Sequence, residues 1–120
     1  MIAVIFEVWP AQGRKDDYLA IAAALRADLD IIDGFISVER FQSLSNPEKL
    51  LSLSFWRDDE AVKQWRNHFK HRESQTKGRS GVFADYRLRV ATVMRDYSLT
   101  ERAEVPEDSR AIHQRAFDEK

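Results

Sequence analysis

The order in which strand-like and helix-like stretches follow each other constrains the fold of this chain more than any other feature. Strand-like stretches are rich in β-branched and aromatic residues, and helix-like stretches repeat apolar residues every three or four positions. Along the chain they are a strand at residues 2–9, a helix at 16–32, strands at 35–43 and 49–56, a helix between Asp58 and Lys77, and a strand at 81–97. This order predicts a ferredoxin-like βαββαβ arrangement of the α+β class.

In such a fold, four antiparallel strands form one sheet and both helices cover the same face of it. The bare face is expected to carry Trp9, Trp56 and Val93, which are too apolar to remain in water. Two such faces pressed together across a two-fold axis form a closed barrel. We therefore expect a homodimer, a dimeric α+β barrel.

Alternation along the strands assigns side chains to the two faces of the sheet. The expected groups are Phe35, Ser37, Glu39 and Phe41 against Ile36, Val38 and Arg40 in the second strand, and Tyr86, Leu88 and Val90 against Arg87 and Arg89 in the last. The first strand places Glu7 on the face of Trp9, towards either the helices or the dimer interface. A buried Glu7 needs a cationic partner, which Arg87 or Arg89 could provide. Such an ion pair, or an exposed carboxylate, is favoured over a catalytic acid.

The second helix gathers more residues that could bind or react than any other segment. Asp58 stands where an N-cap belongs, followed by two acidic residues in the first turn. Helical spacing assigns the following residues to the face that packs on the sheet, or to its edge: Ala61, Val62, Trp65, Phe69 and Arg72 on the face, His68 and Gln75 on the edge.

Two interpretations of Trp65 and His68 remain open at this point. Spacing alone favours a core tryptophan and a half-buried histidine hydrogen-bonded to the backbone. In the functional interpretation His68 is a general base, because the ordinary pKa of histidine, roughly 6.5, suits proton abstraction near neutral pH. Arg72 and Gln75 would then border the gap between helix and sheet and contact a substrate.

Composition excludes several classes of function. The chain has 120 residues, no cysteine and a formal net charge of −1, which exclude disulfides and thiol chemistry and give no global attraction to nucleic acid or anionic membranes. Acidic residues are interleaved with the arginines, and no aromatic stacking motif for nucleic acid is present.

His68 and His71 diverge on the helix and lack a third ligand at a suitable spacing, so no metal site is expected. The N-terminus lacks the pattern of a signal peptide or membrane span, which favours the cytoplasm.

The composition changes after Tyr97. Residues 98–120 are strongly charged, and Pro106-Glu107-Asp108 is a new helix start. We expect residues 1–97 to form one domain. The remainder is either a loosely attached tail or a helical arm that docks on the partner subunit.

Several of these residues together resemble the antibiotic biosynthesis monooxygenase family. The resemblance covers residues 1–97 and rests on the element order, Phe55-Trp56 at a strand end, the acidic cap Asp58-Asp59-Glu60, Trp65 nine residues after Trp56, and the closing strand around Tyr86. Its most specific part is WRNHFKHRESQTKGR followed by DYRLRVA.

The resemblance implies a dimeric α+β barrel with a pocket between helices and sheet in each subunit. Some members oxygenate polyphenolic substrates without metal or flavin, and a tryptophan at the place of Trp65 often belongs to that pocket. In those enzymes the substrate's own phenolate or enolate donates an electron to dioxygen. We therefore expect a cofactor-independent monooxygenase acting on a small aromatic or quinol-like compound. Trp65 and His68 would be catalytic, and Arg72, Gln75, Tyr86 and Glu7 would bind the substrate.

Two other functions are compatible with the same fold. The first is a small-ligand-binding or stress-associated protein without catalysis. The second is haem degradation, which in one branch of the family uses an asparagine on the first strand, the central tryptophan and a histidine ten residues after it. In this chain the tenth position after Trp65 is Gln75, and Glu7 stands near the place of the asparagine. Haem degradation is therefore disfavoured.

Overall fold

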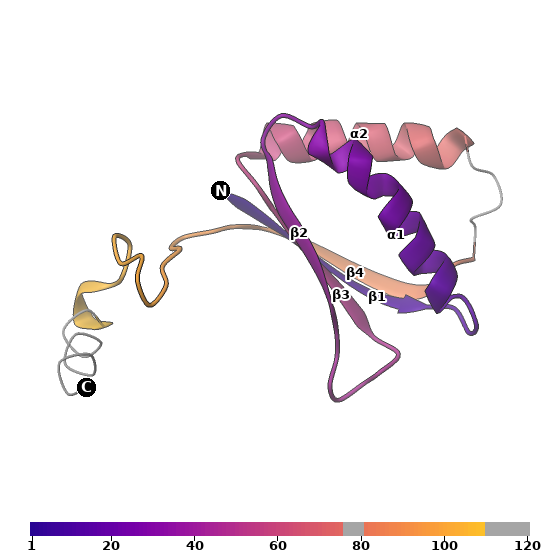
Figure 1. The fold of residues 1–120 in the computed structure, drawn as a ribbon, viewed down its shortest axis with the longest axis horizontal. Helices are drawn as coiled ribbons and strands as arrows, with labels where there is room; N and C mark the ends of the chain where they lie inside the picture. Colours follow the sequence, from indigo (N-terminus) through magenta and orange to yellow (C-terminus); the bar gives the residue numbers. More distant parts are fainter. Residues whose placement is uncertain (76–80, 110–120) are drawn as a thin grey trace.

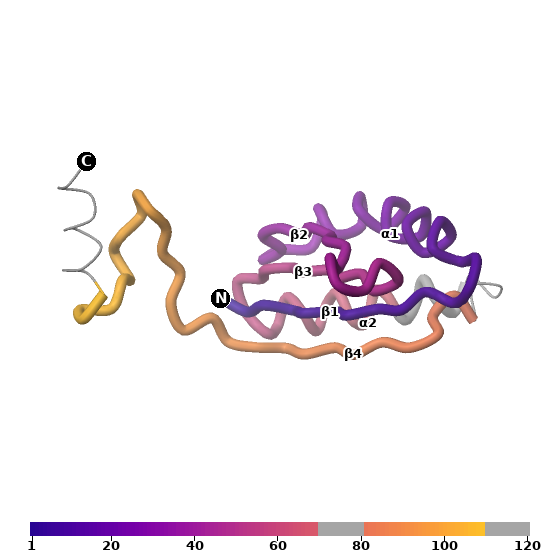
Figure 2. The backbone as a smooth tube through the Cα atoms, turned by 90° about the horizontal axis from the view of Figure 1, so that it is seen from below, coloured from indigo at the N-terminus to yellow at the C-terminus, as the bar shows by residue number. Residues whose placement is uncertain are grey.

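The computed structural model of the chain describes the backbone of residues 1–75 and 81–109, and the side chains of residues 1–69 and 81–109. Its helices and strands follow the predicted order: β1 (Ile2–Pro10), α1 (Lys15–Asp30), β2 (Phe35–Gln42), β3 (Leu50–Trp56), α2 (Asp59–Gln75) and β4 (Phe83–Thr92). The strands form one antiparallel sheet in the order β2-β3-β1-β4, as Figures 1 and 2 show. Both helices lie on one face (Figure 1). The predicted ferredoxin-like α+β fold is confirmed.

The buried core lies between the helices and the covered face of the sheet, and it has two parts. We call them the first and second core clusters. The first consists of Val8, Tyr18, Leu50 and Val82, with Phe6 and Ile21 packed against it. The second consists of Leu29, Trp56, Ala61 and Val62, with Ile2, Val4, Ile32, Phe35, Val38 and Trp65 packed against it. Each helix contributes to the second cluster, which therefore fixes both helices over the same end of the sheet.

Trp56 does not lie on the bare face, and that expectation is wrong. Its side chain is only 1% exposed and belongs to the second core cluster. Trp9 lies on the other face, because it is separated by one residue from Glu7 and alternates with Val8 of the first cluster. The two tryptophans therefore have different roles, one in the core and one on the surface.

The expected alternation of β2 is wrong at its first residue. The pairing between β2 and β3 shifts between Phe35 and Ser37, so Phe35 lies opposite Trp56 and packs against the same cluster as Val38. The ring of Phe35 contacts Trp56 edge to face at 5.2 Å, and Arg26 of α1 covers it. An irregularity of this kind places one extra residue in a strand and changes the face of those before it.

β4 is shorter than the expected strand at residues 81–97. Its last residue, Thr92, pairs with Ile2, the first residue of β1. β4 lies at the sheet edge and has β1 as its neighbour, so the pairing ends where β1 begins; one further hydrogen bond joins the Val93 amide to the Met1 carbonyl at 3.0 Å.

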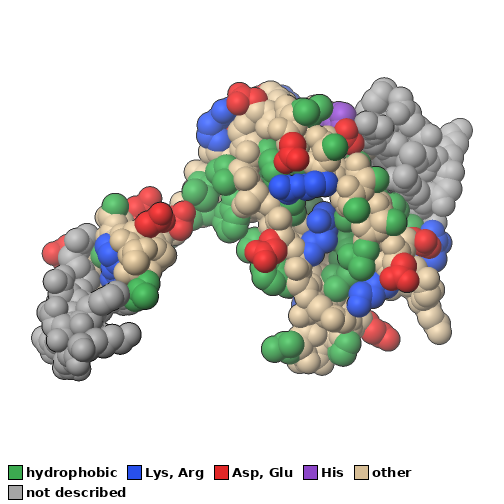
Figure 3. Space-filling model, viewed as in Figure 1, with side chains coloured by type: hydrophobic (Ala, Val, Ile, Leu, Met, Phe, Trp, Pro, Cys, Tyr) green, Lys and Arg blue, Asp and Glu red, His purple; other side chains and the backbone are tan. Residues whose placement is uncertain are grey.

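Beyond β4 the chain leaves the sheet and extends away from it (Figure 1). This segment folds locally: the Ser98 amide donates to the Glu101 carbonyl, and Arg102 lies over the ring of Tyr97. Residues 107–109 are helical, at the helix start predicted there. Figure 3 shows charged and hydrophobic side chains interspersed on both the main body and this segment. Whether this segment is a loosely attached tail or a helical arm on a partner subunit stays open, and residues 110–120 lie outside the described part.

Gly34 should be the least replaceable glycine among those described. Its φ of +95° is left-handed, and a Cβ there would lie 2.8 Å from the Cβ of Ala61 at the start of α2. We expect Gly34→Ala to lower the free energy of unfolding by about 2 kcal/mol or more, because backbone strain and overlap with Ala61 add together. Urea denaturation measures this change.

Gly13→Ala is the matched control. Gly13 also has a positive φ, +75°, but a Cβ there would meet nothing within 4 Å. Gly13→Ala should lower the free energy of unfolding by only about 1 kcal/mol, which is the cost of a left-handed conformation for alanine. Equal losses in the two variants would contradict the close packing of Gly34 on α2.

Candidate active site between the two helices

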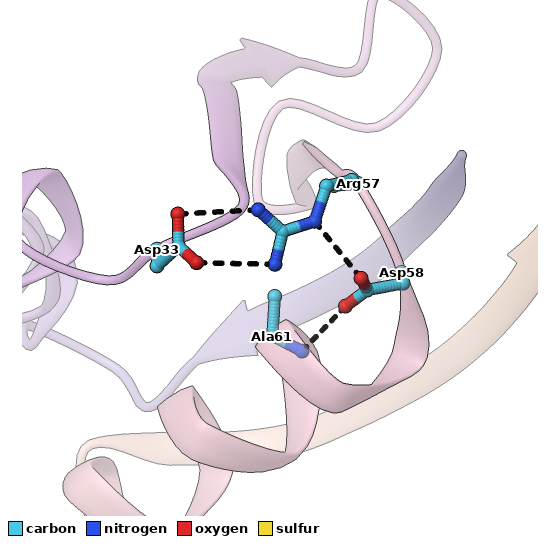
Figure 4. A network of polar contacts seen from close by, with 4 residues as sticks. All are labelled: Asp33, Arg57, Asp58 and Ala61. Carbon is cyan, nitrogen blue, oxygen red and sulfur yellow. Dashed lines mark hydrogen bonds and ion pairs between the residues drawn. The ribbon is translucent and has the colours of Figure 1, made fainter.

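The start of α2 is fixed by a network of polar contacts between two turns (Figure 4). The Ala61 amide donates to Asp58 Oδ1 at 2.9 Å, which confirms Asp58 as the N-cap. Arg57 donates from Nε to Asp58 at 2.9 Å and from Nη1 and Nη2 to Asp33 at 3.1 and 3.2 Å. The Arg57 amide also donates to the Gly34 carbonyl at 2.7 Å. The turn after α1 is thereby joined to the turn before α2.

This network changes the ionisation of its members. Hydrogen bonds from Arg57, and then from the Ala61 amide, lower the pKa of the Asp58 carboxyl. The carboxylates of Asp33 and Asp58 raise the pKa of the Arg57 guanidinium. Both groups are therefore held in their charged forms, which favours the closed network.

Trp65 is the central aromatic side chain of α2. It is half-buried and packs against the second core cluster, 6.4 Å from Trp56 between ring centroids. On its other sides lie Phe69 at 6.1 Å and the imidazole of His68, stacked at 5.9 Å with 29° between the planes. One edge of Trp65 is therefore in the core, while its neighbour on α2 is a group that can accept a proton.

His68 faces Asp28 of α1. Its Nε2 lies 3.7 Å from Asp28 Oδ1, and the side chains are 29% and 15% exposed respectively. Nε2 itself is buried and has no hydrogen-bond partner among the described residues. At 3.7 Å the contact is longer than a hydrogen bond, but a carboxylate at this place can orient an imidazole.

Asp28 is not among the site residues predicted from the sequence. The signal was present: Asp28 lies seven residues after Ile21 and three after Leu25, on the apolar face of α1. A carboxylate within such a face needs a partner from a neighbouring element, and His68 is one.

Tyr86 is not brought together with His68. It pairs with Val8 at the end of the sheet occupied by the first core cluster, where its ring contacts Phe6 at 5.6 Å and Phe83 at 6.1 Å. The residue is 58% exposed on the edge strand β4. Trp65 packs against the second cluster instead.

Glu7 lies on the face of the sheet opposite the helices. Its carboxylate contacts Lys49 Nζ at 3.2 Å and Arg89 Nη1 at 3.1 Å, and both contacts lower its pKa, with Lys49 the larger cause. The predicted pairing with Arg89 is confirmed. Lys49 also lies over the ring of Trp9 at 5.1 Å. This ion-pair group occupies the bare face and is separated from Trp65 by the sheet.

Two other predicted substrate-binding residues, Arg72 and Gln75, belong to the last turns of α2. Their side chains lie outside the described part. Across residues whose side chains are described, no group of three His, Asp or Glu residues is arranged to hold a metal ion. No helix within the described part is long and apolar enough to cross a bilayer.

Comparison with known proteins identifies relatives of the chain. The family model described as antibiotic biosynthesis monooxygenase matches residues 1–77. A jasmonate monooxygenase of Pyricularia oryzae is 52% identical over 93 residues, which are 78% of this chain and 43% of that protein. An uncharacterised protein of Bacillus subtilis, YqjZ, is 34% identical over 62 residues, 52% of this chain and 53% of that protein. The chain thus spans about half the length of these curated relatives.

Solved structures share the fold at low sequence identity. Rv0793 of Mycobacterium tuberculosis has a TM-score of 0.68 at 18% identity, covering 81% of this chain and 98% of that one. The haem degrader MhuD of the same organism, with two haems bound in its active site, has a TM-score of 0.67 at 16% identity, covering 82% and 100%. At these identities the similarity concerns the fold.

The Asp58 cap should make stability depend on pH in the acid range. The folded pKa of Asp58 lies below its ordinary value of 3.8, so its charged form stabilises the fold above that pH and the contribution is lost as pH falls through the folded value. Asp58→Asn keeps a capping oxygen but removes the charge. We expect the melting temperature of Asp58→Asn to be below wild type at pH 7, with the difference shrinking below about pH 4.

Asp59→Asn is the control for this experiment. It removes the same charge from the same first turn without touching the bonds between Arg57 and Asp58. A pH-dependent difference of the same size in both variants would contradict the network in Figure 4 and indicate a general effect of charge at the helix start.

Proposed function

Because the chain belongs to the antibiotic biosynthesis monooxygenase family, we propose that it is a monooxygenase acting without metal or flavin on a small compound that forms a phenolate or enolate. The observation that carries this proposal is the placement of His68 between Trp65 and Asp28. An imidazole beside a carboxylate can take a proton from the substrate, and an aromatic ring next to it can hold a flat substrate. We retain Arg72 and Gln75 as substrate-binding candidates and leave out Tyr86 and Glu7 because of their positions.

The proposed reaction balances without an external reductant. His68 removes a proton from an activated CH₂ group, and the resulting anion gives an electron to dioxygen. The CH₂ group becomes a carbonyl and the second oxygen atom leaves as water. The protein supplies the base, the orientation of the substrate and the exclusion of bulk water.

Quinol-like compounds such as anthrones have such a CH₂ group. Jasmonate is a second candidate, favoured by the 52% identity to the jasmonate monooxygenase; it carries one CH₂ group beside its ketone. A substrate panel should therefore include both anthrone and jasmonic acid.

Oxygen uptake tests the assignment of His68 and Trp65. With a substrate of the panel, we expect His68→Ala to lower kcat by about 10²-fold or more, the usual contribution of a general base. Trp65→Phe should lower it by about tenfold by loosening the bound substrate. Arg66→Ala, an exposed position on the same helix, is the control and should retain wild-type turnover.

Full activity of both variants would overturn the residue assignment. Wild-type protein that binds these compounds but consumes no oxygen would indicate a non-catalytic ligand-binding protein. A stoichiometric Soret shift on addition of haemin would instead favour haem chemistry, which Gln75 at the usual position of the ligand disfavours.

We also propose that the bare face of the sheet is the dimer interface. By their pairing with β1, Leu51, Leu53 and Phe55 of β3 lie on that face with Glu7 and Ile5. They give the face an apolar strip beside the charged group of Glu7, and such a strip favours association with a second copy.

Leu53→Lys should convert a dimer to a monomer in sedimentation velocity experiments, because it buries a charge in the proposed interface. Leu44→Lys, in the fully exposed β2–β3 turn, should leave the dimer unchanged. A wild-type monomer, or a dimeric Leu53→Lys variant, would contradict this interface.

A further inference from the structure

Among the described residues, two buried side-chain nitrogens lack a hydrogen-bond partner: Nε of Arg40 and Nε2 of His68. His68 belongs to the site already described. Arg40 has no role in it, and its side chain makes no hydrogen bond or ion pair with another described residue. Arg40 is half-buried, but a guanidinium N–H that is buried without a partner is costly, so a polar partner from outside the chain would stabilise it.

Arg40 lies on the covered face of the sheet, in the edge strand β2. It pairs with Ser52, which pairs in turn with Phe6. Phe6 packs against the first core cluster, whereas Val38, two residues before Arg40, packs against the second. Along the sheet, Arg40 and Ser52 therefore lie between the first and second core clusters.

The neighbouring pair continues this polar character. Val38 pairs with Ser54, and Ser54 is buried and accepts a hydrogen bond from Trp56 Nε1 at 2.9 Å. The covered face of β2 and β3 thus presents a polar strip made of Arg40, Ser52 and Ser54, where a helix-covered sheet normally presents apolar side chains. Ser54 is already engaged, while Arg40 Nε is not.

Two features make this strip suited to an anionic ligand. A guanidinium presents several N–H groups in a planar fork that matches a carboxylate in two parallel hydrogen bonds. β2 is also an edge strand, so Arg40 lies near the margin of the covered face, where a ligand can approach without crossing the sheet.

We propose that Arg40 binds the carboxylate of a small organic acid, with Ser52 as a neighbouring hydroxyl donor. The inference rests on the proposed function and favours, within its substrate class, compounds that also carry a carboxylate. Val38, two residues before Arg40, and Trp65 pack against the same core cluster, so the Arg40 site adjoins the cluster that supports Trp65. Jasmonate, the compound in the name of the 52% identical relative, has a ring and a carboxylate.

Matched pairs of ligands test the proposal by quenching of tryptophan fluorescence. The pairs are jasmonic acid with its methyl ester, and cyclohexylacetate with cyclohexylacetamide. Wild-type protein should bind each acid at least tenfold more tightly than its neutral analogue. Arg40→Met should remove that preference by weakening the acids about tenfold or more, as loss of a charge-assisted hydrogen bond predicts, while the neutral analogues bind unchanged.

Arg40→Met also separates a binding role from a structural one. Without ligand its melting temperature should equal or exceed that of wild type, because the substitution removes a buried N–H group that has no partner. Arg66→Met, an exposed arginine of α2, is the control and should keep the preference for acids. Arg40→Lys should restore part of it, since an ammonium retains the charge but not the fork.

The outcomes separate this proposal from the proposed function. Equal binding of acids and neutral analogues in wild type, failure of wild type to bind either acid, or an unchanged preference in Arg40→Met would each overturn the role of Arg40. Each of these three results would still be compatible with monooxygenation of a neutral substrate. An acid that binds through Arg40 without consuming oxygen would support the Arg40 site and count against the monooxygenase.

Discussion

The bonds that Arg57 makes with Asp33 and Asp58 hold together the parts of the molecule on which the candidate site depends. They connect the end of α1 to the start of α2 through side chains, and the Arg57–Gly34 backbone bond connects the same turns. The closeness of Gly34 to Ala61 requires a glycine where the two turns meet. Asp28 and His68 come from different helices, so their separation is set by this junction and by the second core cluster.

The core has an apolar part at each end and a polar strip between them. The second cluster surrounds Trp56 and supports Trp65, while the first closes the other end of the sheet around Val8. A continuous apolar core would pack more simply, so the presence of Arg40, Ser52 and Ser54 on the covered face needs an explanation other than stability. Residues that do not optimise packing are expected where a protein binds a ligand. In the proposed account this strip and the His68 site serve the two ends of one substrate.

Much of the fold could be predicted from the sequence because hydrophobic periodicity depends on local patterns. The order of elements and the Asp58 cap are examples, and the pairing of Glu7 with Arg89 follows from strand alternation within the expected sheet. The face of Phe35 could not, because it depends on an irregularity in the pairing with β3. The length of β4 could not either, since it is set by where β1 begins.

The candidate site was predictable only in part. Trp65 and His68 follow from helical spacing, but the contact between Asp28 and His68 joins residues of two helices that are 40 positions apart in sequence, and helical spacing does not predict such a contact. Tyr86 and Glu7 were assigned to the site from strand alternation without knowledge of which end of the sheet, or which face, lies under α2. Their positions follow from register and packing.

In the proposed mechanism, His68 generates the reactive anion of the substrate before oxygen takes part. Anaerobic mixing of the protein with anthrone separates this step from oxidation, because the enolate absorbs at longer wavelength than the neutral compound. If His68 is the base, wild-type protein produces the enolate band and His68→Ala does not. An equal band in both proteins, or none with wild-type protein that oxidises anthrone once oxygen is admitted, would contradict it.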